Sequence, residues 1–194
     1  DRPVWAIDRG VNICHTLSLP PAHLIGDRDS AAHDAWAWAE EHGARVHAFP
    51  PAKDFTDTEL ALKIAAELMP CALVILTGAF GGRFDHLMSV ASVAAHAALP
   101  CILADEREAL FFLHGDESLT ITCDSPPQAI SLLPFAEECT GITTNGLRWE
   151  LNGAQIHTHS STTISNVLAE SNTEHRFSVT LGSGILGVYL CHKE

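Results

Sequence analysis

The periodicity of the apolar residues changes near Gly115, and this change limits the possible folds more than any other feature of the sequence. Before it, short apolar runs such as residues 72–76 alternate with longer segments rich in helix formers, such as residues 87–98. Alternating strands and helices with short connections are typical of a parallel sheet covered by helices. The sequence therefore predicts an α/β fold that begins with a three-layer domain of parallel strands over residues 1–115.

The residues after Gly115 show no long amphipathic helix. They contain short runs of alternating character, separated by turn signals such as Asn145-Gly146 and Asn152-Gly153. Evenly spaced short strands of this kind build antiparallel sandwiches. We therefore expect a C-terminal antiparallel β-sandwich over residues 116–194. Its predicted strands span residues 118–122, 129–133, 141–144, 147–151, 177–181 and 185–190.

A glycine turn with a charged pair lies between a predicted strand and a predicted helix, at residues 76–86. Gly81 and Gly82 allow the backbone to approach a phosphate closely, and the following helix start favours anions. Arg83 can grip phosphate oxygens with its guanidinium fork, and Asp85 can hold a metal ion or a cationic substrate. The alternative is a glycine turn that carries a surface ion pair.

Acidic residues also follow the other predicted strands of the first domain. In an open α/β sheet the carboxyl ends of the strands share an edge, where ligands bind. Carboxylates together with phosphate oxygens are preferred ligands of Mg²⁺, so this edge is a candidate magnesium site. The acidic residues concerned are Asp8, Asp27, Asp29, Asp54 and Asp57, and the basic Lys53 is clustered with the last two.

Helix capping is an alternative role for some of these polar residues. Asp29 or Ser30 could cap the helix predicted over residues 31–42. Thr56 is the predicted N-cap of the next helix, and Glu59 completes a capping box. Each helix needs only one cap, so capping and metal binding are compatible here.

The charge and the cysteines narrow the possible functions. The net charge of −13, with 11 Lys and Arg residues, argues against nucleic-acid binding, which requires a positive surface. An acidic surface suits a cationic substrate. We see no membrane span and no secretory signal, and six cysteines without a Cys-x-x-Cys pair favour a reducing compartment. We therefore expect a cytoplasmic protein with no nucleic-acid or membrane partner.

Several common catalytic motifs are absent from the sequence. It has no P-loop, no Gly-x-Gly-x-x-Gly fingerprint and no nucleophile elbow. Aspartates, one arginine and glycine turns at strand ends are instead typical of metal-assisted phosphoryl chemistry.

Two motifs are specific enough to indicate a family, namely Lys53-Asp-Phe-Thr-Asp-Thr-Glu59 and Gly81-Gly-Arg-Phe-Asp-His86. Shorter elements occur in order around them. These are Ile7-Asp-Arg-Gly10, Ile25-Gly-Asp-Arg-Asp-Ser30, Ser131-Leu-Leu-Pro134, Thr144-Asn-Gly-Leu-Arg-Trp149 and Ile164-Ser-Asn166. Together, over nearly the whole chain, they resemble the motifs of the bacterial thiamine pyrophosphokinase family.

This resemblance implies an enzyme that transfers the diphosphate of ATP to the hydroxyl of thiamine and leaves AMP. It implies a homodimer with its active sites between subunits. The α/β domain (1–115) would bind ATP and Mg²⁺, and the sandwich (116–194) would bind thiamine and form the dimer.

The resemblance also implies roles for individual residues. The metal ligands would be Asp27, Asp29 and Asp57. Arg83, Asp57 and Asp85 would be catalytic, and the nucleotide would contact Asp8, Lys53, Gly81, Gly82 and Arg83. Thiamine would contact Asp54, and Ser165 and Asn166 of the partner subunit.

Two alternatives remain open at the level of sequence. Val167 and Leu168 follow the Ser-Asn element where many family members have an acidic or aromatic residue. A related enzyme that acts on another heterocyclic alcohol, such as a pterin, is therefore one alternative. A non-catalytic protein that binds thiamine or nucleotide is the other.

Overall fold

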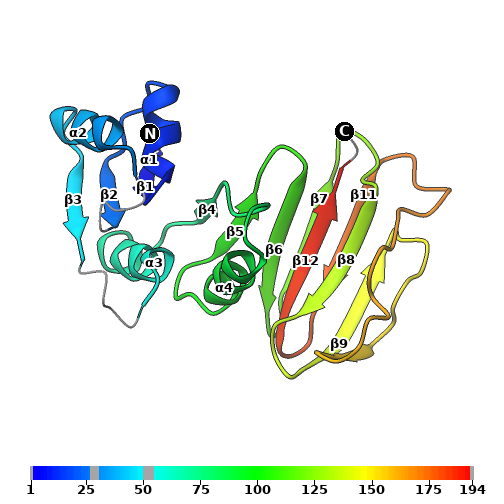
Figure 1. The fold of residues 1–194 in the computed structure, drawn as a ribbon. Coiled ribbons are helices and arrows are strands. Elements are labelled where there is room, and N and C mark those ends of the chain that lie inside the picture. The colour runs from blue at the N-terminus through cyan, green and yellow to red at the C-terminus, as the bar shows by residue number, and fades with distance from the viewer. Residues whose placement is uncertain (1, 27–30, 50–54, 193–194) are drawn as a thin grey trace. The chain divides into compact units, whose positions relative to one another are not determined.

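The computed structural model describes residues 2–26, 31–49 and 55–192 of the 194-residue chain. The chain forms two compact units, residues 1–72 and 73–194, and Figure 1 labels most of their elements. The boundary between the units lies earlier in the chain than the boundary predicted at residue 115, because the strands that follow residue 73 join a sheet of the second unit. The assignment of functional domains to residues 1–115 and 116–194 remains a prediction.

The first unit is a parallel sheet flanked by helices, as the sequence predicts. Leu24 packs in a core with residues of the first two helices, whereas the next residue, Ile25, points to the opposite face and is fully buried. The strands, in sheet order, are β1 (Trp5–Ile7), β2 (His23–Gly26) and β3 (Arg45–Ala48). The helices are α1 (Gly10–Thr16), α2 (His33–Glu41) and α3 (Asp57–Leu68), of which α3 contacts β1 and β2.

The two predicted helix caps have different outcomes. The Thr56 side chain accepts a hydrogen bond of 3.2 Å from the Glu59 backbone N–H, which confirms the predicted cap of α3. Helix α2 has Ala32 at its N-cap, without a cap bond from its side chain, and begins later than its composition indicates. The predicted cap residues Asp29 and Ser30 lie outside the described residues.

The described residues of the second unit form two sheets and one helix, α4 (Phe84–Ala95), which contacts the larger sheet. That sheet has the order β4-β5-β6-β12-β8, and only its first pair is parallel. The smaller sheet, β10-β9-β11-β7, is antiparallel throughout. The strands are β4 (Val74–Leu76), β5 (Cys101–Ala104), β6 (Glu108–His114), β7 (Ser118–Thr122), β8 (Ala129–Pro134), β9 (Glu138–Asn145), β10 (Ala154–His157), β11 (Arg176–Thr180) and β12 (Ile185–Cys191).

One apolar core is shared by the two sheets, which confirms the predicted sandwich. Ile130 and Val188 of the larger sheet and Phe177 and Val179 of the smaller sheet all belong to this core. Along β11 these buried residues alternate with polar residues that face outward. In the described part of the chain, no helix is long and apolar enough to cross a membrane.

The predicted strand over residues 147–151 is wrong. Residues 148–151 form a loop, and Leu147 makes only an isolated bridge to Leu168. The backbone N–H and carbonyl of Trp149, which a neighbouring strand would use, are bonded instead to a side chain, as described below.

Candidate functional site

Asp8, one of the predicted site residues, lies at the carboxyl edge of the first sheet, beside the end of β2. Asp8 directly follows β1, and its backbone N–H donates a hydrogen bond of 2.9 Å to the Ile25 carbonyl. Gly26 has a φ of +144°, and a Cβ at this position would overlap the Asp8 carboxylate. The glycine is therefore required for this close packing. Asp27 and Asp29, which follow it in sequence, lie outside the described residues.

Asp57 lies in the first turn of α3, where the helix dipole favours a negative charge. Its carboxylate and that of Asp8 are of the oxygen-ligand type that Mg²⁺ prefers, so the donor chemistry of this unit fits the metal. Among the residues that the structure describes, no group of three or more His, Cys, Asp or Glu side chains is arranged as a metal site. Lys53 and Asp54 lie outside those residues.

The predicted glycine turn precedes α4. Gly81 and Gly82 have φ values of +84° and +70°, and a Cβ at either would meet nothing within 4 Å. The backbone conformation, rather than lack of space, therefore favours glycine at both positions. Arg83 is the N-cap residue of α4, so it lies at the end of the helix whose first backbone N–H groups attract anions.

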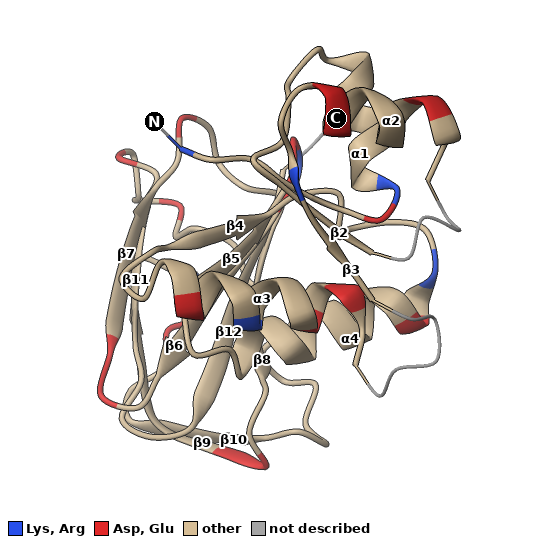
Figure 2. Ribbon diagram, turned by 90° about the vertical axis from the view of Figure 1, so that its left-hand side faces the viewer, with Lys and Arg blue, Asp and Glu red and all other residues tan. Residues whose placement is uncertain are grey.

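Arg83 and Asp85 form a two-point ion pair at this helix start. The guanidinium Nε and Nη2 donate to the Asp85 carboxylate at 3.1 and 2.5 Å. Hydrogen bonding from Arg83 lowers the pKa of Asp85, and the same bonds raise the pKa of Arg83. The side chains are 72% and 61% exposed, so both remain accessible to a ligand. The pair fixes the direction of the only Arg or Lys in this turn, on a chain that carries few basic residues (Figure 2).

A small apolar hollow of about 120 Å³ lies in the sandwich unit. Ile130 and Leu132 of β8 contribute buried side chains to it, and Trp149 and Ile164 line it with side chains that are largely exposed. An apolar hollow with an exposed aromatic ring beside it suits a flat heterocycle. Trp149 was expected in a strand, and the Gly-Leu-Arg-Trp element was the feature of the sequence that drew attention to it.

The Ser-Asn element lies beside this hollow, and Asn166 lines it. The Ser165 backbone has a φ of +63°, and its N–H donates to Oγ of the buried Ser131 at 3.0 Å. The Asn166 Nδ2 donates to the Trp149 carbonyl at 2.8 Å, and its Oδ1 accepts from the N–H groups of Trp149 and Val167 at 3.2 and 2.9 Å. The predicted site residues 165 and 166 are therefore brought together with Trp149.

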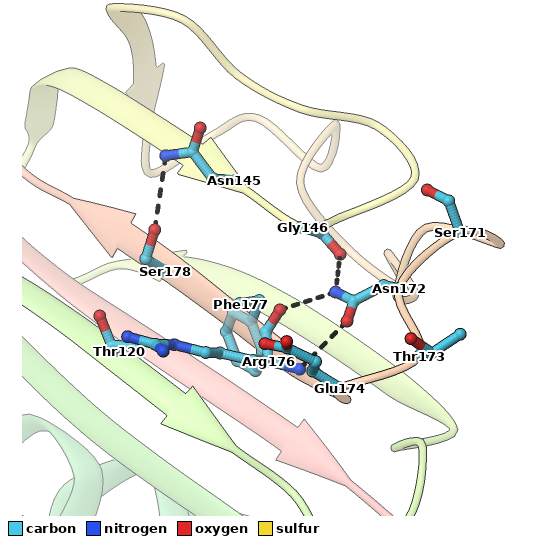
Figure 3. Close-up of a pocket in the computed structure, with 10 residues that line it drawn as sticks. All are labelled: Thr120, Asn145, Gly146, Ser171, Asn172, Thr173, Glu174, Arg176, Phe177 and Ser178. Carbon is cyan, nitrogen blue, oxygen red and sulfur yellow. Dashed lines mark hydrogen bonds between the residues drawn. The ribbon is translucent and has the colours of Figure 1, made fainter.

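A larger polar hollow of about 410 Å³ lies beside the smaller sheet (Figure 3). Asn172 lines this hollow, and its Nδ2 donates hydrogen bonds to the carbonyls of Gly146 and Arg176 at 2.8 and 2.6 Å. Its Oδ1 accepts from the Arg176 N–H at 3.2 Å, and Asn145 donates to the Ser178 hydroxyl at 3.4 Å. These bonds support the chain around Gly146. No predicted site residue lines this hollow.

Comparison with known proteins gives consistent results. Residues 2–102 match the family "Thiamin pyrophosphokinase, catalytic domain", and residues 117–186 match "Thiamin pyrophosphokinase, vitamin B1 binding domain". Thiamine pyrophosphokinase of Bacillus subtilis is 28% identical over 182 residues, which cover 92% of this chain and 84% of that protein.

Solved structures agree with these matches. A crystal structure of thiamine pyrophosphokinase from Bacillus subtilis has a TM-score of 0.84 at 25% identity and covers 100% of this chain and 90% of its own. The corresponding protein from Geobacillus thermodenitrificans has a TM-score of 0.81 at 25% identity, with coverages of 100% and 88%.

Proposed function

The chain belongs to the thiamin pyrophosphokinase family, and we propose how its residues divide the reaction of that family among them. The enzyme forms thiamine diphosphate by transferring the diphosphate of ATP to the hydroxyl of thiamine, with AMP as the other product. The observation that carries this conclusion is the successive match of the catalytic and the vitamin B1 binding families along one chain.

We propose that the carboxyl edge of the first sheet holds Mg²⁺ through Asp27, Asp29 and Asp57. The support is the close packing of Gly26, the last described residue before Asp27, against the Asp8 carboxylate. When bound, Mg²⁺ neutralises phosphate charge. Asp8 would face the nucleotide on the same edge.

Arg83 would bind the phosphates of ATP and offset the charge that develops on the departing AMP. Asp85 would align the guanidinium through the two hydrogen bonds described above. Gly81 and Gly82 would let backbone N–H groups reach phosphate oxygens, and Lys53 would supply a second positive charge. Because the reacting hydroxyl needs little activation, alignment and charge neutralisation would supply most of the rate.

Thiamine would bind with its rings against the apolar hollow beside Trp149. The face of an indole ring attracts a cation, which suits the positively charged thiazolium ring. Ser165 and Asn166 flank this hollow, and Asp54 would contact the substrate from the α/β domain.

We further propose a homodimer in which the sandwich of one copy binds thiamine for the catalytic domain of the other. Six free thiols are consistent with a cytoplasmic location.

A substrate assay tests the proposal. Purified protein with ATP, Mg²⁺ and thiamine is expected to form thiamine diphosphate, and removal of the metal with EDTA is expected to stop turnover until Mg²⁺ is restored. Turnover that is unaffected by EDTA would contradict the magnesium site. A pterin alcohol offered in competition should leave the thiamine rate unchanged; preferential transfer to the pterin would contradict thiamine as the substrate.

A further inference from the structure

The loop of residues 146–151, here called the tryptophan loop, carries the most exposed aromatic ring beside the apolar hollow. Trp149 is 59% exposed and is not packed into the sandwich core. Residues 148–151 do not form a strand, although backbone hydrogen bonds join Arg148 to the Val167 carbonyl and Leu151 to the Thr144 N–H on either side of Trp149. The orientation of this ring therefore depends on how the backbone of the loop is held and on the Arg148 guanidinium, which lies 5.2 Å from the ring centroid.

Asn166 holds that backbone from a position 17 residues further along the chain. Its amide bonds both the N–H and the carbonyl of Trp149, so it takes the place of a paired strand at this residue. A side-chain amide oxygen accepts about two hydrogen bonds. Here both come from the protein, from Trp149 and Val167, so Oδ1 has no acceptor capacity left for a ligand.

The backbone of Asn166 is itself fixed to the larger sheet. Its N–H and carbonyl form two hydrogen bonds with Ile130, at 2.8 and 2.7 Å, and Ile130 is fully buried in the core. Leu132 and Thr163 add a second pair of bonds next to it, through the Thr163 carbonyl and hydroxyl. Asn166 therefore links the rigid strand β8 directly to Trp149.

We propose that Asn166 is a positioning residue, which holds Trp149 as the aromatic surface for thiamine rather than accepting a hydrogen bond from the substrate. This inference rests on the proposed function, because it requires Trp149 to contact thiamine. It differs from the expectation that Asn166 accepts a hydrogen bond from thiamine.

Asn172 provides a matched comparison at the other end of the same loop. It also makes three hydrogen bonds to backbone groups, but they hold Gly146 and Arg176 rather than Trp149 (Figure 3). Loss of Asn172 removes a similar number of bonds without releasing the backbone of Trp149.

A double-mutant cycle with Asn166→Ala and Trp149→Ala tests the inference, with KM measured separately for thiamine and ATP. Asn166→Ala is expected to raise the KM for thiamine about tenfold, with the KM for ATP within about twofold. In the Trp149→Ala background the same change is expected to have less than about a twofold effect. Independent effects that multiply would show that Asn166 acts on the substrate directly and would overturn the proposal.

Three further results complete the test. Asn172→Ala is expected to lower Tm but keep the thiamine KM within about twofold. An equal rise in KM would indicate general loosening and contradict the inference. If Asn166→Ala does not fold, Asn166→Asp replaces it, since it keeps the acceptor oxygen and loses the donor to the Trp149 carbonyl. A Trp149→Ala variant with unchanged thiamine KM would instead overturn the proposed thiamine site, and the inference with it.

Discussion

Asp57 is the proposed metal ligand whose surroundings the structure describes, at the first turn of α3. Asp57→Asn keeps the size of the side chain but removes its charge. We expect turnover to fall by at least about 10²-fold, because the phosphates lose part of their charge neutralisation. Steady-state rates at saturating Mg²⁺ measure this change, and circular dichroism checks that the fold is retained.

Glu59→Gln is the matched control for this prediction, since Glu59 lies in the same helical turn and pairs with Lys63 on the surface. Its capping bond uses the backbone N–H and is therefore kept. Turnover of this variant should remain within about twofold of the parent. A similar loss in both variants would remove Asp57 from the site.

The geometry of the Arg83 guanidinium matters at this site in addition to its positive charge. The Asp85 carboxylate is gripped by two guanidinium nitrogens, a geometry that an ammonium group does not reproduce. Arg83→Lys is therefore expected to lower kcat about 10²-fold, although the positive charge is retained. Single-turnover measurements at saturating ATP test this, and a rate within twofold of the parent would show that the fork geometry does not matter.

His23 and His47 form a pH-sensitive pair on neighbouring strands. His23 Nδ1 and His47 Nε2 are 2.8 Å apart, so one ring donates and the other accepts, and both rings cannot be protonated in this arrangement. Burial and nearby positive charge, including Arg45, lower the pKa of both histidines. Below the ordinary histidine pKa of about 6.5, the unfolded chain therefore binds more protons than the folded chain. The free energy of unfolding consequently falls as the pH drops through that value.

Denaturant unfolding between pH 7.5 and 5.5 checks this direction. Trp5 stacks on His23 at 4.0 Å, so tryptophan fluorescence reports on this part of the first unit. Between these two pH values, the free energy of unfolding of the His47→Gln variant is expected to fall less than that of the parent. An identical pH dependence in the two proteins would exclude the pair as its source.

At the scale of the element, the tryptophan loop depends on its first residue. Gly146 has a φ of +84°, and a Cβ would lie 2.5 Å from the Arg176 carbonyl and 2.9 Å from Asn172 Nδ2. Gly146→Ala is expected to reduce the free energy of unfolding by at least about 3 kcal/mol, from backbone strain and steric overlap together.

Gly153→Ala separates these two causes. Gly153 also has a positive φ, of +62°, but open space surrounds it. Its replacement should therefore cost only about 1 kcal/mol, the strain of the left-handed backbone. Equal losses in the two variants, measured by urea unfolding, would show that the contacts at Gly146 contribute nothing.

Local patterns predicted most of the elements but failed where distant residues decide the structure. The helix start at Thr56 depends on adjacent residues and was predicted correctly. Leu147, Trp149 and Leu151 alternate like a strand, yet the amide of Asn166 occupies the backbone of Trp149. Strand β6 was not predicted, although its near-continuous apolar sequence is typical of an interior strand.

At the scale of the whole molecule, family-like motifs indicated the candidate site more fully than local geometry does. The described residues contain Asp8, Asp57, Arg83, Ser165 and Asn166, whereas Asp27, Asp29, Lys53 and Asp54 lie outside them. Their convergence on one magnesium–diphosphate site therefore remains a prediction. The supporting role of Asn166 had no signal in its own surroundings, because it depends on a contact across 17 residues.

Tracing the phosphorus atoms of ATP tests the central claim most directly. With ATP labelled separately at each phosphate, the β and γ labels are expected to appear together in thiamine diphosphate, and the α label in AMP. This result would establish transfer of an intact diphosphate. Appearance of the γ label alone in thiamine monophosphate, with ADP as the other product, would contradict the account.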